Sequence, residues 1–472
     1  MPSRRLPALV LATALIVSVL SVVGAGSAAS ASSPAATPAA TADSARAAAR
    51  LNYVIPGGSY FSFPNRGKAA KYAIRNRILA TIRSTVGGPR TANGLPGPTN
   101  GTIRIATWSF KDWAIAKALV AARNRGVSVQ IVGARSRNAP NPQWRYLKRT
   151  FGSRLARPGQ PATVDKVSFA RDCRGSCRGR GGTPHAKYLL FTNVANSHVP
   201  FTTIQTSMNL TQMGYSGQWN QAEVTHREDV YQHFMTIFKE ARLGVPVSNP
   251  HRFYGTVDGM YKSEFYPFPG ASRTTDPVMR ELNKVGCSNG GSRTQIRIIQ
   301  YSIYGDRGVY IAKKLRSLWN AGCNVKVIYA LGTRPVMSIL RNGSGRGAIP
   351  VRQSVITGAG RVITKYNHSK WMTIVGRYAG ANGQYITMSG SSNWSRFALS
   401  GDEQQQIIDN RGQALRHNRF FNITWAQKSS HLPGFGIKGQ EGRMTESARL
   451  ASIPMEITWG KGIYKYMSPN GG

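Results

Sequence analysis

Two short stretches of the chain alternate apolar and polar residues and resemble each other closely. Residues 103–109 read IRIATWS, and residues 296–302 read IRIIQYS. A period of two is typical of a strand. Each stretch is followed by a helical pattern that ends at a glycine, Gly126 or Gly322, and then by a second apolar run. The pattern therefore predicts one strand–helix–strand unit in each half, with a parallel strand pair and a right-handed crossover.

The repeat extends well beyond these two units. Each half also contains, in the same order, an aromatic and proline-rich run, a helical segment, a glycine-rich loop and an aromatic helix. The equivalent segments are residues 61–64 and 265–269, 68–84 and 276–285, 86–101 and 288–292, and 231–238 and 417–425. We therefore predict an α/β fold of two similar lobes, residues 51–245 and 246–428, with a C-terminal extension, residues 429–472. Two similar lobes pack most economically about a pseudo-twofold axis, and a site on that axis would receive equivalent residues from both.

The first thirty-odd residues have the composition of a targeting segment. Two arginines precede an apolar run at residues 6–23, and residues 29–31 read Ala-Ser-Ala, which is typical of a cleavage site. We predict a signal peptide over residues 1–31, a flexible leader over residues 32–50, and a secreted, extracellular protein. No other apolar run in the sequence is long enough to span a bilayer.

The four cysteines of the chain suit an oxidising compartment. Cys173 and Cys177 are close enough in sequence to pair locally, and Cys287 and Cys323 would then close a larger loop. The alternative is that C-x₃-C forms half of a zinc site. No His or Cys pair at ligand spacing completes such a site. We therefore expect two disulfides and no metal.

The charge balance narrows the range of partners. Lys and Arg number 62 and Asp and Glu only 19, which gives a formal net charge of +43. So few carboxylates argue against a protein built around Ca²⁺ or Mg²⁺. The excess of positive charge predicts a polyanionic partner, such as nucleic acid, an anionic membrane or an anionic wall polymer. The alternative is a basic solvated surface without a specific partner. A hydrophobic content of 41% excludes wholesale disorder.

Chemistry-bearing residues recur at equivalent places in the two halves. Each half has His-x-Lys at the start of an apolar run, followed at nearly the same distance by Ser-x-Asn. The equivalent sets are His185, Lys187, Ser207 and Asn209, and His368, Lys370, Ser391 and Asn393. Side chains two apart on a strand share a face, so each His projects with its Lys and each Ser with its Asn. One copy of either motif arises easily by chance, whereas two ordered copies inside an independent repeat indicate function.

These residues resemble the phospholipase D superfamily, whose signature is H-x-K-x₄-D followed by G-S-x-N, usually twice. The resemblance covers both lobes, from residue 51 to about 428. The second copy, Gly390-Ser391-Ser392-Asn393, matches well, whereas Thr206 takes the place of the glycine in the first. Both copies lack the aspartate, since its positions hold Thr192 and Val375. The tyrosyl-DNA phosphodiesterase branch of the family also lacks it.

The resemblance implies two lobes of mixed β-sheet flanked by helices that share one active site. It also implies phosphodiester cleavage in two steps through a phosphohistidine, without a metal or other cofactor. His185 would be the nucleophile and His368 the general acid and base. The residues that would bind the phosphoryl oxygens are Lys187, Lys370, Asn209 and Asn393.

Each histidine needs a partner on its other ring nitrogen. In two-lobed family members this partner commonly comes from the opposite lobe. Glu403 would therefore orient His185, and either Asn220 or Glu223 would orient His368. The alternative for the acidic pair that contains Glu403 is an exposed loop. Two serines of the motifs are candidates to support these contacts, Ser207 and Ser391.

The substrate remains open at this stage. The leading hypothesis is a secreted phospholipase D-like hydrolase of phospholipid headgroups, since surface cations attract an anionic bilayer. The same charge would suit an extracellular nuclease or DNA-end phosphodiesterase. A third possibility is an inactive, basic polyanion-binding protein. A basic cluster before the first motif is either a phosphate-binding lip or a solvated loop, and it contains Arg171, Arg174, Arg178 and Arg180. We expect a monomer.

Overall fold

The computed structural model describes residues 51–92, 94–153, 166–429 and 467. The predicted signal peptide and leader lie outside the described residues, as does the C-terminal extension apart from Ser429 and Met467. Among the described residues, no helix combines the length and the apolar character that crossing a membrane requires.

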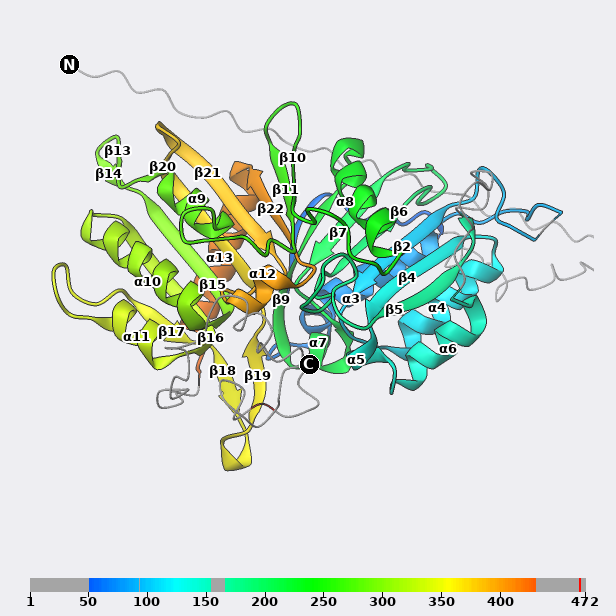
Figure 1. The fold of residues 1–472 in the computed structure, drawn as a ribbon, viewed down its shortest axis with the longest axis horizontal. Coiled ribbons are helices and arrows are strands. Elements are labelled where there is room, and N and C mark those ends of the chain that lie inside the picture. Colours follow the sequence, from blue (N-terminus) through cyan, green and yellow to red (C-terminus); the bar gives the residue numbers. More distant parts are fainter. Residues whose placement is uncertain (1–50, 93, 154–165, 430–466, 468–472) are drawn as a thin grey trace, which may run out of the picture. The chain divides into compact units, whose positions relative to one another are not determined.

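The first lobe is built on a mixed nine-stranded sheet (Figure 1). Its strand order is β18-β19-β9-β7-β6-β2-β4-β5, with β1 paired to β9. The strands are β1 (Gly58–Ser62), β2 (Thr102–Thr107), β4 (Ser128–Ala134), β5 (Phe169–Cys173), β6 (Tyr188–Phe191), β7 (Thr202–Thr206), β9 (Gln218–Thr225), β18 (Val355–Thr357) and β19 (Ile363–Asn367). Strands β2 and β4 pair in parallel, as the strand–helix–strand pattern predicts, and β6 lies antiparallel on the other side of β2.

The second lobe repeats this arrangement in a second mixed sheet of nine strands. Its order is β10-β11-β22-β21-β20-β15-β16-β17, with β12 paired to β20. The strands are β10 (Arg252–Gly255), β11 (Tyr261–Phe265), β12 (Val285–Gly286), β15 (Gln295–Ile303), β16 (Asn324–Gly332), β17 (Val351–Gln353), β20 (Lys370–Tyr378), β21 (Ala381–Gly390) and β22 (Gln404–Asp409). Two short pairs complete the described strands, β3 (Phe110–Lys111) with β8 (Leu210–Thr211) and β13 (Ser288–Asn289) with β14 (Ser292–Arg293).

Helices flank both sheets (Figure 1). Those of the first half are α2 (Lys68–Lys71), α3 (Ala73–Ser84), α4 (Trp113–Asn124), α5 (Arg135–Asn138), α6 (Pro142–Phe151), α7 (Gln212–Ser216) and α8 (Glu228–Ala241). Those of the second are α9 (Pro277–Asn283), α10 (Gly305–Asn320), α11 (Arg334–Arg341), the 3₁₀ turn η2 (Ala359–Arg361), α12 (Arg396–Ser400) and α13 (Arg411–Ala426). The crossover helices α4 and α10 are followed by Gly126 and Gly322 at φ of 95° and 103°, the left-handed conformation that glycine tolerates best.

The two lobes share apolar clusters, so they do not meet as separate domains. Around α8, the ring of Phe234 packs 5.1 Å from Tyr188 of the first sheet and 4.9 Å from Phe265 of the second. Around α13, Trp219 of the first sheet and Trp371 of the second join one cluster. The β18–β19 hairpin, although it lies in the second half of the sequence, pairs with β9 of the first sheet. The described residues accordingly belong to one compact unit.

Both predicted disulfides are present in the structure. Cys173 is joined to Cys177 at the end of β5, and Cys287 is joined to Cys323 next to β16. None of the described cysteines is free.

Candidate active site

Each His-x-Lys motif lies at the start of an inner strand of its sheet. His185 and Lys187 directly precede β6, and His368 and Lys370 lie at the start of β20. All four side chains are buried, with exposed fractions of 2–5%. The alternation of an extended chain places each histidine on the same side as its lysine. The predicted His and Lys residues are therefore held inside the protein.

A strand segment of the opposite lobe holds each motif by its backbone. The amide of His185 donates to the carbonyl of Asp402 at 2.9 Å, and the amide of His368 donates to that of Trp219, also at 2.9 Å. The side chain of Gln404 accepts from the amide of Lys187 and donates to its carbonyl, at 2.9 and 3.1 Å. Gln221 holds the amide and carbonyl of Lys370 in the same way, both at 3.3 Å. The contacts between lobes thus repeat on the two sides of the site.

The ring of each histidine is oriented by a side chain of the opposite lobe. His185 Nδ1 lies 2.8 Å from Glu403 Oε1, the contact expected from the sequence. His368 Nδ1 lies 3.1 Å from Asn220 Oδ1. Of the two candidate partners, Asn220 and Glu223, it is therefore Asn220 that orients His368. With both Nδ1 atoms engaged, Nε2 of each ring is the nitrogen that can act on a substrate. The supporting serines donate their hydroxyls as a matched pair, Ser207 to Asn220 Oδ1 at 2.8 Å and Ser391 to Glu403 Oε2.

Glu223 has a different role from the one considered for it. Its carboxylate lies 3.0 Å from His417 Nε2 and accepts from the hydroxyls of Ser389 at 2.9 Å and Ser59 at 2.5 Å. Strand alternation explains the difference. Glu223 is three residues beyond Asn220 on β9, so it projects from the opposite face. It fastens α13 and β1 to the sheets and does not contact His368.

The asparagines of the motifs keep polar atoms free for a ligand. Asn209 is fully buried, yet neither its amide nitrogen nor its oxygen has a hydrogen-bond partner, and Asn393 Oδ1 also lacks one. Buried polar groups without partners are costly and uncommon in folded proteins. Lys187 and Lys370 donate to the carbonyls of their own motif histidines, which aims both ammonium groups along the site. The arrangement can supply two ammonium groups and two amides to an anion.

Comparison with known proteins found one matching domain family and several solved structures of similar fold. The family model of the PLD-like domain of cardiolipin synthase matches residues 98–242. Phosphatidylserine synthase from Haemophilus influenzae has a similar fold, with a TM-score of 0.52 at 12% identity, over 82% of this chain and 91% of that one. Residues 98–242 thus match a phospholipase D-like domain, and the chain has a fold similar to that of the synthase.

A second solved structure has a similar fold. Polyphosphate kinase from Porphyromonas gingivalis matches 83% of the chain with a TM-score of 0.50 and 13% identity. The chain spans about half, 54%, of the length of that kinase. At these identities the likeness shows the fold alone. No curated protein matches the sequence.

Burial and mutual repulsion set the charges of this site. Burial lowers the pKa of His185 to about 4, against the opposing effect of the Glu403 carboxylate, and it lowers the pKa of Lys187 to about 7. The pKa values of His368 and Lys370 lie well below their ordinary values because of burial and then because of the neighbouring lysines. Burial raises the pKa of Glu403, but the adjacent His185 and Lys187 outweigh it and hold the carboxylate ionised. In the empty site the two histidines and two lysines therefore lose their protons more readily than usual. A bound anion would raise their pKa values again.

Sequence reasoning missed two aromatic side chains that line the site. The ring of Trp108 stands edge-on to His185 at 5.2 Å, and the ring of Tyr301 lies 4.7 Å from His368. The ammonium groups of Lys187 and Lys370 lie 5.8 and 4.9 Å from these rings. The repeat itself carries the signal that could have found them, because IRIATWS and IRIIQYS place Trp108 and Tyr301 at the same position.

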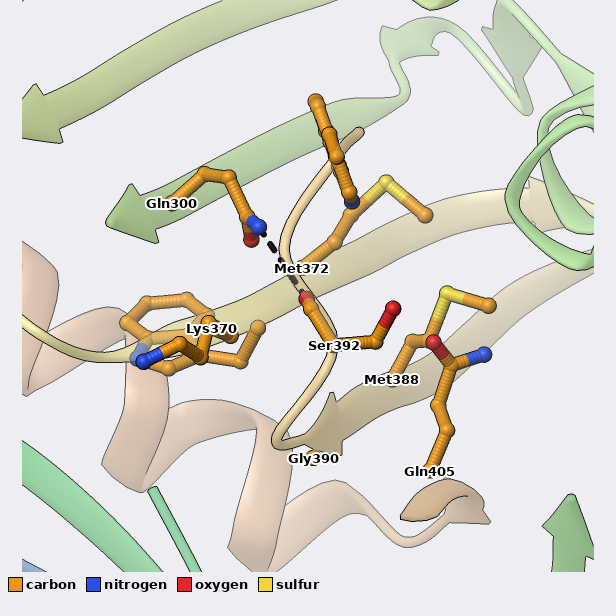
Figure 2. A pocket seen from close by; sticks show the side chains of 9 residues that line it. Gln300, Lys370, Met372, Met388, Gly390, Ser392 and Gln405 are labelled. Carbon is orange, nitrogen blue, oxygen red and sulfur yellow. Dashed lines mark hydrogen bonds between the residues drawn. The ribbon is translucent and has the colours of Figure 1, made fainter. Parts of the chain in front are cut away.

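A small cavity of about 10 Å³ adjoins Lys370 in the second lobe (Figure 2). Polar side chains of Gln300, Ser392 and Gln405 line it beside Met372, and Gln300 donates to the carbonyl of Ser392 at 3.1 Å. This volume holds about one water molecule. The cavity is too small for a substrate group. It lies next to the Gly390–Asn393 turn, and we assign it no part in binding substrate.

Asp402 links the site to the first disulfide. It is buried, and its Oδ2 atom accepts from the amide of Cys177 at 2.6 Å. Burial raises the pKa of Asp402 to about 6, although Arg178 opposes the shift. Arg178 is fully buried and pairs with Glu240 at 2.7 Å, so it is a structural residue and not part of an exposed lip. Among the described residues, no group of three or more His, Cys, Asp or Glu side chains could hold a metal ion.

Proposed function

We propose that this protein is a secreted phospholipase D-like phosphodiesterase that hydrolyses phospholipid headgroups through a phosphohistidine. The observation that carries the proposal is the pair of buried histidines, one from each lobe, with their two lysines and partly unpartnered asparagines. Secretion is supported by the composition of the first 31 residues and by two disulfides, which persist in oxidising compartments.

In the first step, Nε2 of His185 attacks phosphorus in line with the leaving oxygen. The bond between phosphorus and that oxygen breaks as the bond between phosphorus and nitrogen forms. Nε2–H of His368 gives its proton to the leaving alkoxide. Lys187, Lys370 and the two motif asparagines stabilise the charge on the non-bridging oxygens. Glu403 stabilises the positive charge that remains on the ring of His185.

In the second step, His368 acts in the opposite sense. Its Nε2, now without the proton, accepts a proton from a water molecule, and the resulting hydroxide attacks phosphorus. The bond from phosphorus to His185 breaks, and the ring returns to its neutral form with Nδ1–H still directed at Glu403. The monoester leaves, and both histidines regain their starting protonation states.

Substrate binding prepares His368 to act as an acid. In the empty site burial and the lysines hold its pKa well below the ordinary value. A phosphodiester anion placed between Lys187 and Lys370 offsets their repulsion and raises the pKa of every cationic group around it. The proton donor of the first step is therefore formed together with the complex.

Two observations favour a lipid substrate over a nucleic acid. The matched family domain is that of cardiolipin synthase, and the neighbour that is similar over most of both chains is a phosphatidylserine synthase. The formal charge of +43 suits an anionic bilayer, although it suits a nucleic-acid backbone as well. The second candidate, an extracellular nuclease or DNA-end phosphodiesterase, rests on that charge.

The experiment compares both substrates directly. Choline release from phosphatidylcholine vesicles and nicking of plasmid DNA are measured in parallel, each with and without EDTA. We expect choline release that persists in EDTA. Nicking without choline release would favour the nuclease, and loss of turnover in EDTA that Mg²⁺, Ca²⁺ or Zn²⁺ restores would reject the metal-independent mechanism. Absence of both activities in the folded protein would leave the polyanion-binding alternative.

A further inference from the structure

A cavity of about 690 Å³ lies beside the active site and contains none of the residues described so far as catalytic. Its wall consists of residues 179–182, residues 246–250 and four side chains from elsewhere in the second lobe. Those four are Pro267, Pro269, Phe397 and Ser400. Ligand pockets in proteins typically enclose about 300–1,000 Å³. We call this space the proline cavity.

Two segments of its wall continue along the chain to His185 and to its partner Glu403. Beyond residue 182, the amide of Asp402 donates to the carbonyl of Thr183, and the amide of His185 donates to the carbonyl of Asp402, both at 2.9 Å. Gly182 and Ser400 of the wall are thus three residues from His185 and Glu403, along two paired stretches of chain. Three extended residues span roughly 10 Å. A substituent of a phosphodiester held at His185 can therefore reach the cavity.

The wall is built and not a chance gap between loops. The buried guanidinium of Arg178 donates to the carbonyl of Pro250 at 2.5 Å and to that of Tyr266 at 3.0 Å. The carbonyl of Arg178 accepts from the amide of Val247 at 2.8 Å. Arg178 therefore joins the segment that begins at Gly179 to the segment 246–250 and to the chain next to Pro267. The prolines restrict the backbone further, so little conformational entropy is lost when a ligand binds.

The chemistry of the wall is mostly apolar. Prolines at four positions, Val247 and Phe397 face the space, and Arg180 is the one charged residue among those that line it. Immediately before the wall segment 246–250, Leu243 and Val245 are 48% and 53% exposed. A groove that tracks nucleic acid needs several cations along the backbone and aromatic rings for the bases. With Arg180 as the one basic residue in its lining, the cavity lacks the row of cations that such a ligand requires.

We propose that the proline cavity binds an acyl chain of a glycerophospholipid whose phosphodiester lies at His185 and His368. The proposal rests on the phosphodiesterase function proposed above and specifies its substrate. The exposed Leu243 and Val245, just before the wall segment 246–250, add apolar surface that a lipid can contact. Arg180, the cation of the wall, is placed to meet the polar end of the lipid.

A tryptophan at position 181 tests the cavity. Gly181 lines the cavity, a Cβ atom added there meets no atom within 4 Å, and its φ lies outside the left-handed region, so the structure can accommodate Gly181→Trp at the wall without backbone strain. Gly343, in the loop after α11, has the same two properties, which makes Gly343→Trp the matched control. The measured quantity is the ratio of kcat/KM for dipalmitoyl phosphatidylcholine vesicles to kcat/KM for monomeric dibutyryl phosphatidylcholine. We expect Gly181→Trp to lower this ratio at least about tenfold and Gly343→Trp to leave it unchanged.

A binding measurement separates this proposal from the proposed function. The probe is pyrenedecanoyl phosphatidylcholine, whose fluorescence reports transfer from water to an apolar site, added to the His185→Asn variant. We expect Gly181→Trp in that background to weaken probe binding about tenfold. Equal binding with and without Gly181→Trp, or an unchanged chain-length ratio, overturns the proposal even if phosphodiesters are cleaved. Probe binding that Gly181→Trp abolishes, in a protein whose wild-type form cleaves no lipid, supports the cavity and rejects the function.

Discussion

The two halves of the active site are built to the same plan but carry different charges. His185 faces the carboxylate of Glu403, whereas His368 faces the amide of Asn220 at the equivalent position. A carboxylate stabilises a positively charged imidazole, which is the state that the proposed mechanism gives His185 after it has bonded to phosphorus. A neutral amide fixes the tautomer of His368 without holding a proton on it, so that ring can release and regain its proton. The difference between the partners therefore supports the proposed roles, which the family resemblance implies: His185 as the nucleophile and His368 as the acid.

The largest expected effect comes from exchanging the histidines themselves. His185→Asn and His368→Asn should each lower hydrolysis of a phospholipid by about 10⁴-fold or more, as loss of a nucleophile or its proton carrier does in other two-step enzymes. With a p-nitrophenyl phosphodiester, which needs little protonation of its leaving group, the two variants should differ. His368→Asn should accumulate phosphate on His185, because no base activates water, and His185→Asn should accumulate none.

Acid-quenched intact mass and peptide mapping of both variants distinguish the possibilities. Phosphate on His368 in the His185→Asn variant would reverse the assignment and retain the reaction class. If both variants kept wild-type activity and trapped nothing, the shared two-histidine site would be wrong.

The next largest effect should come from the partners. Glu403→Gln keeps the side-chain length and its contact to Ser391 but removes the charge beside His185, and we expect kcat to fall by about 10²–10³-fold. Asn220→Asp adds a carboxylate beside His368, which keeps the ring of His368 protonated. A protonated ring cannot accept a proton from water, so the second step should slow about tenfold. Stopped-flow measurement of the nitrophenolate burst assigns each loss to its step.

A buried carboxylate of the same strand region provides the control for these partners. Glu223→Gln lies on β9 but contacts His417 and not a motif histidine, so it should change thermal stability more than kcat. If Asn220→Asp lowered the burst rate more than Glu403→Gln did, the two histidines would have exchanged roles.

Much of this arrangement follows from the sequence because the repeat makes equivalent residues visible. The duplicated motifs identify His185 and His368, and the crossing of partners between lobes places Glu403 correctly. The glutamines that hold the motif backbones, Gln221 and Gln404, could not be found in this way, since a buried amide ladder has no characteristic spacing. The pairing of β19 with β9 is also invisible in the sequence. It depends on contacts between lobes that local periodicity does not encode.

A third, smaller effect concerns protons taken up with an anion. In the empty site the pKa of Lys187 is about 7, lowered by burial, and an anion between the lysines raises it. Sulfate, whose charge is constant in this range, should therefore bind with proton uptake, and its affinity should fall up to about tenfold per pH unit above pH 7. Titration calorimetry at pH 8 in buffers of different ionisation enthalpy measures the uptake. Lys187→Met should reduce the number of protons taken up with sulfate by the part that Lys187 contributes.

The same shift has a consequence for folding that runs in the opposite direction. Unfolded lysine keeps its proton up to about pH 10.5. Between pH 7 and that value the unfolded state therefore binds more protons than the folded one at this position, and the free energy of unfolding rises with pH. Sulfate should flatten this rise. If the free energy of unfolding depended on pH in the same way in the wild type and in Lys187→Met, Lys187 would not have a depressed pKa in the free site.

The smallest expected effect on activity separates the two disulfides, one in each lobe. Cys173–Cys177 closes a separation of 4 residues and Cys287–Cys323 one of 36. Loop-closure entropy then predicts that replacing the first pair by serine lowers the free energy of unfolding by about 2 kcal/mol and replacing the second by about 4 kcal/mol.

Activity should follow the reverse order. The amide of Cys177 holds Asp402, whose chain neighbour Glu403 orients His185, so loss of the first disulfide should lower kcat about threefold to tenfold. The second disulfide contacts no residue of the site, and its loss should leave kcat unchanged in protein that is still folded. Guanidinium unfolding curves and kcat for each double variant measure both quantities. Loss of kcat confined to the Cys287–Cys323 variant would show that Asp402 does not connect the first disulfide to the nucleophile.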